Sequence, residues 1–263
     1  VTIVGANGRV GDLLASVGEG KDVLVGRSDS IPEDGEGPIL VCTRNDVLDS
    51  VIEKTPASRR CDLVFLQNGF LEDYLESKGL ADNTQALIYF AVSKKGETPI
   101  DGITDLSPDG LTVTTGKWGD VVAERIQACG MKCGVVDAAT YRKAMFEKLM
   151  WICAFMLVGT VNGGITVGEV VGKKTEEVVD LILEMGDAIT ESTGVEFDDR
   201  CAARLCSYAQ AVAHFPTAIK EFEWRNGFFW DLSEEAEDEE LPDPCPTHTA
   251  YCNQGVVEDL FSF

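Results

Sequence analysis

A glycine-rich turn follows the first apolar run of the chain, and no other feature constrains the fold as strongly. The chain begins Val-Thr-Ile-Val, continues Gly-Ala-Asn-Gly-Arg-Val-Gly and then enters a helical stretch that ends near Val17. A glycine turn between a strand and a helix lets the backbone approach a pyrophosphate, which binds the N–H groups and the positive dipole end of the helix. The predicted phosphate-binding residues are Gly5, Ala6, Asn7, Gly8, Arg9, Val10 and Gly11.

Short apolar runs alternate with helical stretches through the first half of the chain, which is typical of βαβ units and a parallel sheet. The expected strands are 1–5, 23–26, 39–42 and 63–67, with helices at 8–17 and 46–54. Further strands at 86–92, 100–106 and 111–115 are predicted to complete the sheet with antiparallel members, before a helix at 118–128 and a strand at 134–136. We expect an α/β fold that opens with a Rossmann-type dinucleotide-binding domain over residues 1–138.

The second half of the chain carries no strand signal. Helices are predicted at 139–158, 175–193, 198–214 and 216–224, and the first of them is apolar on nearly every face, as in a buried helix. The acidic run from Ser233 to Glu240, which three prolines follow, is interpreted as a solvated loop. Residues 139–263 are therefore predicted to form a mainly helical domain for substrate binding and dimerisation.

Charge and composition exclude several classes of partner. The formal net charge of −23 opposes binding to nucleic acid or to an anionic membrane, because both attract cationic surfaces. The longest apolar run, Leu149 to Val158, is much shorter than the ~20 residues of a membrane span. Nine scattered cysteines favour reduced thiols and an intracellular location, cytoplasmic or organellar. Cys129 and Cys133 lie four apart without a second ligand pair nearby, so no metal site is expected.

The residues after the second predicted strand favour one dinucleotide over the other. In NAD-binding proteins an acid about 20 residues after the glycine turn holds the ribose 2′-hydroxyl. Here Arg27 and Ser28 follow the strand. An arginine pairs with a 2′-phosphate through a charge-assisted fork, and a serine adds a donor. The expected cofactor is NADP(H), although Asp29 leaves NAD open.

Six stretches of the chain resemble the ketopantoate reductase family, in the order in which the family carries them. They are the glycine turn, Val41-Cys42-Thr43-Arg44, Leu66-Gln67-Asn68-Gly69-Phe70, Phe146-Glu147-Lys148-Leu149, Thr160-Val161-Asn162 with Gly168-Glu169-Val170, and Glu221 to Gly227. The resemblance implies NADPH-dependent reduction of a 2-keto acid, bound in a cleft between a Rossmann domain and a helical domain. It also leaves room for a homodimer.

The resemblance implies roles for four residues. Lys148 matches the family's catalytic lysine, which gives a proton to the alkoxide that forms as hydride arrives. Asn68 matches an asparagine that bridges the nicotinamide ribose, the substrate and the lysine. Arg44 matches a basic position that faces the cofactor phosphate, and Glu221 matches the acid on the substrate hydroxyl side. Desolvation of such a lysine lowers its pKa, and we expect a nearby acid to raise it again.

Two departures from the family pattern leave other functions open. Ile152 and Met156 stand one and two helical turns after Lys148, where the family usually has asparagines. Either the substrate is more apolar than ketopantoate, or the chain is a non-catalytic NADP-binding protein of the same fold. A third alternative is a short-chain-type reductase that uses the Tyr-x-x-x-Lys pair Tyr74 and Lys78.

Overall fold

The structure, a computed structural model, describes residues 1–92 and 94–262. Contacts divide these residues into two compact units. The first comprises residues 1–103 and 107–144, and the second comprises residues 104–106 and 145–263. Each unit has its own architecture and is described by itself.

The first unit is built on a sheet whose described strands follow the order β2-β1-β3-β4-β5-β6-β7. Their bounds are β1 Thr2–Val4, β2 Val23–Val25, β3 Ile39–Val41, β4 Leu63–Phe65, β5 Gln85–Leu87, β6 Val113–Thr115 and β7 Gly134–Val135. Pairing is parallel from β2 across to β5, β6 runs antiparallel to β5, and β7 is parallel to β6. The predicted α/β fold with a Rossmann-type first half is confirmed.

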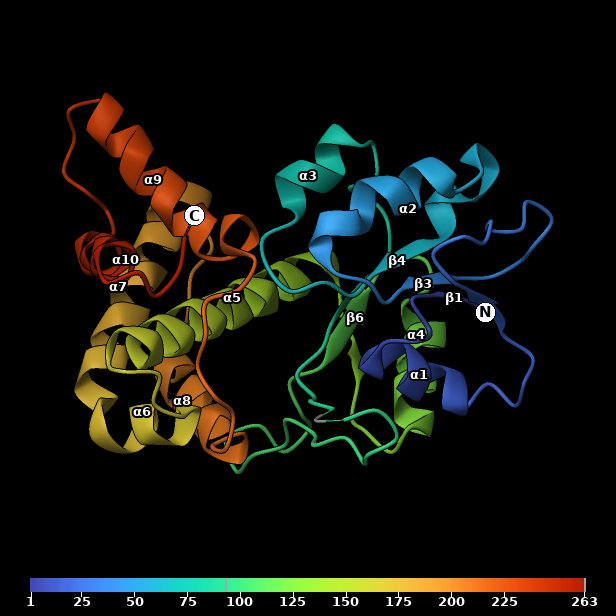
Figure 1. Cartoon of the computed structure of the whole chain (residues 1–263), viewed down its shortest axis with the longest axis horizontal. Helices are drawn as coiled ribbons and strands as arrows, with labels where there is room; N and C mark the ends of the chain where they lie inside the picture. Colours follow the sequence, from blue (N-terminus) through green and yellow to red (C-terminus); the bar gives the residue numbers. More distant parts are fainter. Residues whose placement is uncertain (93, 263) are drawn as a thin grey trace. The chain divides into compact units, whose positions relative to one another are not determined.

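Helices cover both faces of this sheet, which explains why its strands are continuous apolar runs. Figure 1 shows α1 (Arg9–Ser16) and α4 (Gly119–Ala128) on one face, and α2 (Leu48–Lys54) and α3 (Glu72–Ser77) on the other. Leu14 of α1 and Ile126 of α4 are fully buried in a cluster with the strand residues Ile3, Leu40 and Val64. The two 3-10 helices η1 (Asn45–Val47) and η2 (Ala57–Asp62) complete the connections on either side of α2.

The predicted strand at 100–106 is wrong. Ile100 forms one isolated bridge with Ala91, and no strand is assigned in this segment. Because β5 pairs directly with β6, the sheet leaves no position for another strand between them. The Asp101 carboxylate instead accepts a hydrogen bond from the Lys132 backbone N–H at 2.7 Å. The predicted strand at 86–92 is also too long, since β5 ends at Leu87.

The second unit is helical. Its elements are α5 Ala138–Val161, which begins in the first unit, α6 Val167–Lys173, α7 Thr175–Thr193, α8 Cys201–Ala211, η3 Phe222–Trp224, α9 Asn226–Asp238 and α10 Pro246–Val257. By length and composition α5 could cross a membrane, but 78% of its most apolar window is buried inside the protein. It is a core helix, as its uniformly apolar sequence predicts.

Two predictions for this unit are wrong. The segment 216–224 is not an α-helix, because Pro216 pairs with Thr166 in a β-bridge and only Phe222–Trp224 forms a short 3-10 turn. The acidic run is not a loop, because α9 extends to Asp238 and takes in most of it. Glutamate and alanine are good helix formers, and this preference prevails over the repulsion between their neighbouring charges.

Candidate functional site

The glycine turn joins β1 to α1 in the geometry that a pyrophosphate requires. Gly5 adopts φ +83°, and a Cβ at this position would lie 2.6 Å from the carbonyl oxygen of Cys42 at the end of β3. A Cβ at Gly11 would overlap the Gly5 carbonyl oxygen, so the helix approaches the strand only because both residues are glycines. Asn7, Gly8 and Arg9 are exposed at the apex of the turn. The predicted glycine turn between β1 and α1 is therefore present, and its apex is exposed; its binding of a pyrophosphate stays a prediction.

The carboxyl ends of β2, β1, β3 and β4 meet around this turn. The Gly5 N–H donates to Val25 at the end of β2. Gln67, just after β4, donates through Nε2 to the carbonyls of Val41 (2.7 Å) and Thr43 (3.1 Å) at the end of β3. Ligands of open α/β sheets bind at this edge, where the connections from neighbouring strands diverge. Gln67 was not among the predicted site residues, although it immediately precedes one of them.

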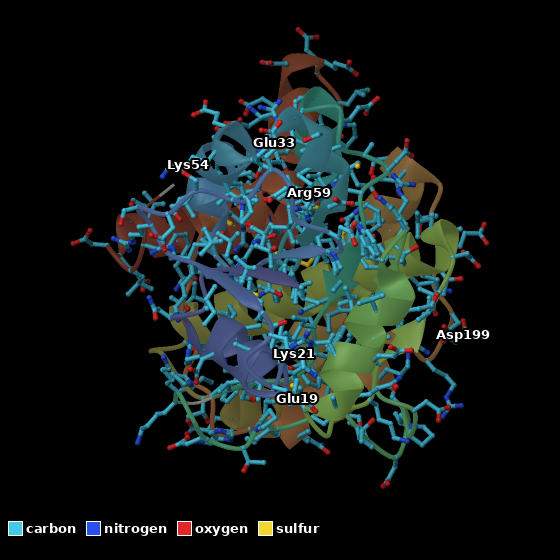
Figure 2. The ribbon with its side chains drawn as sticks, turned by 90° about the vertical axis from the view of Figure 1, so that its right-hand side faces the viewer. Glu19, Lys21, Glu33, Lys54, Arg59 and Asp199 are labelled. Atoms are coloured by element: carbon cyan, nitrogen blue, oxygen red, sulfur yellow. The ribbon has the colours of Figure 1, made fainter. Side chains whose placement is uncertain are left out.

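The loop after β2 brings the predicted specificity residues to the same edge. Arg27 and Ser28 are exposed, and the Asp29 carboxylate accepts a hydrogen bond from the Gly26 N–H at 2.8 Å. Lys54, at the end of α2, donates from Nζ to the Arg27 carbonyl at 3.0 Å. Figure 2 shows the Lys54 side chain at the surface of the protein. Sequence reasoning missed Lys54, because only the fold brings the end of α2 beside this loop.

Arg44 and Asn68 follow β3 and β4. Arg44 is exposed and forms an ion pair with Asp46 at 3.2 Å. Asn68 is half-buried, and its backbone carbonyl accepts a hydrogen bond from Asn45 Nδ2 at 2.9 Å. Gly69 has φ +118°, so the chain turns sharply directly after Asn68. The fold thus fixes the backbone of Asn68 at the carboxyl edge of the sheet.

Lys148 lies in the second unit, inside the apolar middle of α5. Its side chain is only 6% exposed. Burial, together with the positive charge of Arg225, lowers the pKa of Lys148 from 10.5 to about 7. The net shift is downward, so burial and the Arg225 charge dominate, and the acid expected near Lys148 stays a prediction. The cation that accompanies Lys148 was not foreseen from the sequence.

Glu221 and Arg225 form an ion pair across η3. Arg225 Nη2 lies 2.7 Å from Glu221 Oε2, and the side chains are 13% and 15% exposed. Glu221 has φ +49°, a left-handed conformation that is rare for a residue with a side chain. Strained residues of this kind persist where the surrounding structure holds them, and they concentrate at functional sites. Lys148, Glu221 and Arg225 all lie in the second unit.

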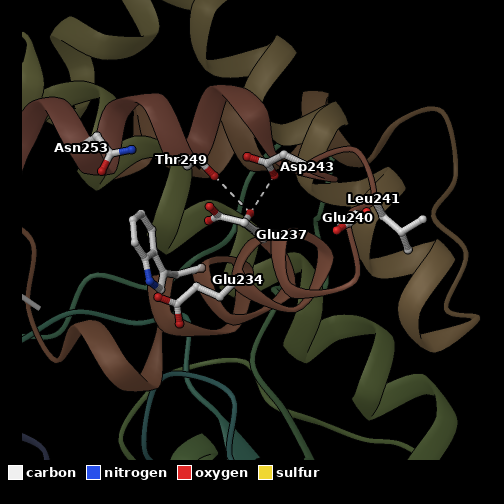
Figure 3. A pocket seen from close by; sticks show the side chains of 9 residues that line it. Glu234, Glu237, Glu240, Leu241, Asp243, Thr249 and Asn253 are labelled. Carbon is white, nitrogen blue, oxygen red and sulfur yellow. Dashed lines mark hydrogen bonds between the residues drawn. The ribbon is translucent and has the colours of Figure 1, made fainter.

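A hollow of the second unit lies elsewhere, between α9 and α10. It measures about 650 Å³ and is lined by Trp230, Ser233, Glu234, Glu237, Glu240, Leu241, Asp243, Thr249 and Asn253. Figure 3 shows the Ser233 hydroxyl bridging Asp243 and Thr249 beside three glutamates. Four carboxylates line this hollow, so it repels an anionic substrate.

Known structures share this arrangement over nearly the whole chain. A ketopantoate reductase of the PanE/ApbA family from Ralstonia eutropha JMP134 matches with a TM-score of 0.68 and 19% identity, over 98% of this chain and 99% of that one. The 2-dehydropantoate 2-reductase from Methylococcus capsulatus matches with a TM-score of 0.67 and 15% identity, over 98% and 96% of the two chains. The chain has the ketopantoate reductase fold.

Enzymes of this fold do not all act on one compound. D-mandelate dehydrogenase, in a ternary structure with NADH and anilino(oxo)acetate, matches with a TM-score of 0.65 and 12% identity over 98% of this chain and all of that one. No family model and no curated relative matches the sequence. The likenesses are therefore likenesses of fold, and the proteins that share it include ketopantoate reductases and a D-mandelate dehydrogenase whose structure holds NADH.

The Tyr-x-x-x-Lys pair, Tyr74 and Lys78, contacts a carboxylate of α2. Tyr74 donates its hydroxyl to Asp49 of α2 at 3.0 Å, and Lys78 Nζ lies 2.7 Å from the same carboxylate. Burial and the Asp49 charge raise the pKa of Tyr74. A short-chain-type reductase needs a tyrosine that gives up its proton readily, so the short-chain alternative is disfavoured.

Proposed function

We propose that this protein reduces the keto group of a 2-keto acid with NADPH. The observation that carries the proposal is Lys148, a lysine buried in an apolar helix with its pKa lowered to about 7. A buried lysine with a shifted pKa is costly to keep, and such groups concentrate at catalytic sites. The fold shared with ketopantoate reductases and with D-mandelate dehydrogenase supports the same reaction class.

The first unit has the groups that would hold the dinucleotide. The turn from Gly5 to Gly11 would receive the pyrophosphate, and Arg44 would face a cofactor phosphate. Arg27 and Ser28, joined by Lys54, would bind the 2′-phosphate that distinguishes NADPH from NADH. When bound, the reduced nicotinamide supplies a hydride to the carbonyl carbon of the substrate. Asn68 would position the nicotinamide ribose and the substrate.

Lys148 would complete the reduction as the proton donor. Arrival of hydride at the carbonyl carbon leaves negative charge on the carbonyl oxygen, which an ammonium stabilises and then protonates. With a pKa of about 7, Lys148 is close to half protonated at neutral pH and readily exchanges its proton. Reduction should therefore slow as the pH rises through about 7. Glu221, fixed by Arg225, would line the substrate site.

The side chains that follow Lys148 along α5 favour a substrate without a further hydroxyl. Ile152 is buried and Met156 half-buried, and neither donates a hydrogen bond. A buried hydroxyl without a partner costs about 1–3 kcal/mol. Trimethylpyruvate differs from ketopantoate only by lacking that hydroxyl, so it is the informative comparison. We expect kcat/KM for trimethylpyruvate to be roughly 10-fold higher or more, and an equal or higher value for ketopantoate would contradict this assignment.

The same two side chains favour the second candidate, a dinucleotide-binding protein without catalysis. A panel of 2-keto acids assayed by NADPH absorbance separates the two functions, because the non-catalytic protein binds NADPH and oxidises none of it.

The assembly is a separate proposal. A ketopantoate reductase from Staphylococcus aureus, at 16% identity and a TM-score of 0.62, is dimeric. We propose a homodimer here also, which light scattering of the purified protein would test.

A further inference from the structure

We propose that Arg225 binds the carboxylate of the substrate, so that a fixed guanidinium beside Lys148 selects 2-keto acids over uncharged carbonyl compounds. The inference rests on the proposed function and assigns one residue within it. Sequence comparison did not single out Arg225, which lies inside the stretch from Glu221 to Gly227. The structure places it at the junction of η3 and α9.

Arg225 is held in place from two sides. Its backbone N–H donates to the Phe222 carbonyl at 3.0 Å, and its Nη2 donates to Glu221 Oε2 at 2.7 Å. The side chain is 13% exposed. A guanidinium fixed in this way loses little conformational freedom when a ligand binds, which favours its use as a carboxylate fork.

One nitrogen of this guanidinium still needs an acceptor. Arg225 Nε is buried and has no hydrogen-bond partner among the described residues. A buried donor without an acceptor costs about 1–3 kcal/mol, and more when it belongs to a charged group. Nε and Nη2 form one side of the guanidinium, to which a carboxylate can bind through both of its oxygens. Nη2 has two hydrogens, and its bond to Glu221 uses one of them. The substrate carboxylate would supply the missing acceptor.

The charges around Arg225 favour an anion. Its positive charge adds to the effect of burial in lowering the pKa of Lys148, and it opposes the rise that burial causes in the pKa of the Cys153 thiol, so Arg225 acts on two residues of α5. Arg225 pairs with the Glu221 carboxylate through Nη2, which leaves its Nε for another acceptor. In a protein of net charge −23, a little-exposed guanidinium of this kind is a local attraction for an anionic group. The acidic hollow between α9 and α10 offers the opposite environment.

Placing the carboxylate on Arg225 also assigns the keto oxygen. In a 2-keto acid the carboxylate and the keto group are on adjacent carbons, so a guanidinium that binds the first leaves the second for Lys148. An ester or amide of the same acid keeps the keto group and loses the anionic charge. Selectivity between an acid and its amide therefore measures Arg225 separately from the chemistry of Lys148.

The test compares Arg225→Met with the unmutated protein on a keto acid that the latter reduces and on the N-methyl amide of that acid. Loss of a charge-assisted contact of about 1.5–3 kcal/mol corresponds to roughly 10–100-fold. We expect KM for the acid to rise by that factor, while KM for the amide stays within about 3-fold. Arg225→Lys keeps the charge without the fork, so its KM for the acid should lie between those of the unmutated protein and Arg225→Met. It also covers the case in which Arg225→Met does not fold.

The pH profile provides a readout that a structural role would not change. Without the neighbouring positive charge, the pKa of Lys148 rises, so the alkaline decline in rate should move to higher pH in Arg225→Met. Arg204→Met is the matched control, because Arg204 is also a little-exposed arginine of this unit, 2.6 Å from Glu147 and 2.7 Å from Asp198. Arg204→Met should change KM for the acid and KM for the amide by the same factor.

Two results would overturn the inference. Equal effects of Arg225→Met on acid and amide, or an unchanged KM for the acid, would show that Arg225 does not bind the carboxylate, while the proposed reductase function would stand. An unmutated protein that reduces neither the acids nor their amides would instead remove the proposed function, and the role of Arg225 with it.

Discussion

At the scale of one residue, Lys148 lowers the folding stability of the protein at the position proposed to supply the proton. An ammonium in the middle of a buried helix loses its hydration, and the Arg225 charge adds repulsion. A methionine of similar length would fill the same space without either cost. The retention of a lysine here agrees with a role in the reaction more than with a role in packing.

The stability of the protein should therefore depend on Lys148 in a pH-dependent way. The pKa of Lys148 is lowered from 10.5 to about 7 on folding, so between these values the unfolded chain binds the extra proton and stability rises with pH. Below pH 7 the buried charge exerts its full cost. We expect Lys148→Met to raise Tm, by roughly 2–4 °C for each kcal/mol recovered, with the largest gain at pH 6 and little at pH 10. A gain independent of pH, measured by calorimetry, would contradict this assignment.

Arg27 should decide the choice of cofactor. Arg27→Ala removes the fork expected for the 2′-phosphate, so NADPH affinity should fall by roughly 10–100-fold while NADH affinity stays nearly constant. Lys21→Ala is the control, because Lys21 is an exposed cation before β2 that pairs with Glu19 (Figure 2). Fluorescence titration of both cofactors gives the four constants. Equal dissociation constants for NADPH and NADH in the unmutated protein would remove NADP specificity from the account.

At the scale of elements, the close packing of α1 on β1 forms the glycine turn of the proposed cofactor site. Gly11→Ala would drive a methyl group into the Gly5 carbonyl, and both atoms belong to backbone that cannot turn aside. We expect a loss of about 1–3 kcal/mol in stability and a marked loss of NADPH binding. Gly172→Ala in α6 is the matched substitution, since a Cβ there meets nothing within 4 Å. It should gain about 0.5–1 kcal/mol and leave binding unchanged, as urea titrations with and without NADPH would measure.

The sequence predicts some elements of this fold better than others, for physical reasons. The glycine turn, the parallel strands and α7 follow from local patterns, and the structure has them close to the predicted bounds. The strand expected at 100–106 fails because a strand there would need a place between β5 and β6, and these two strands pair directly with each other. The acidic helix was missed because its solvated charges suggested a loop, whereas its residues favour helix.

The candidate site divides in the same way. Some site residues follow strands or occupy motifs, so one sequence suffices to predict them. They are the residues of the glycine turn, Arg27, Arg44, Asn68 and Lys148. Lys54 and Arg225 are not predicted in this way, because each gains its place through a contact with a residue that only the fold or a local turn brings close. The acid predicted beside Lys148 stays a prediction, and the ion pair of Glu221 with Arg225 is what the sequence did not indicate.

At the scale of the whole molecule, the net charge of −23 opposes an anionic cofactor and an anionic substrate. The site must therefore supply local attraction, and the protein does so in both units. The first has the N-terminus of α1 and the exposed Arg27 and Arg44 at one edge of its sheet, and the second has the buried Lys148 and the little-exposed Arg225. Dilute positive charge elsewhere would not suffice, because exposed charges are screened beyond about 10 Å at ordinary ionic strength.

The central claim is that this protein reduces 2-keto acids and that Lys148 supplies the proton. The direct measurement follows NADPH oxidation with a panel of 2-keto acids for the unmutated protein and for Lys148→Met, with NADPH affinity measured in parallel. We predict turnover of at least one acid, a loss of about 10²–10⁴ in rate for the variant, and NADPH binding within a few-fold in both. A folded Lys148→Met that still turns over near the parent rate would contradict the claim.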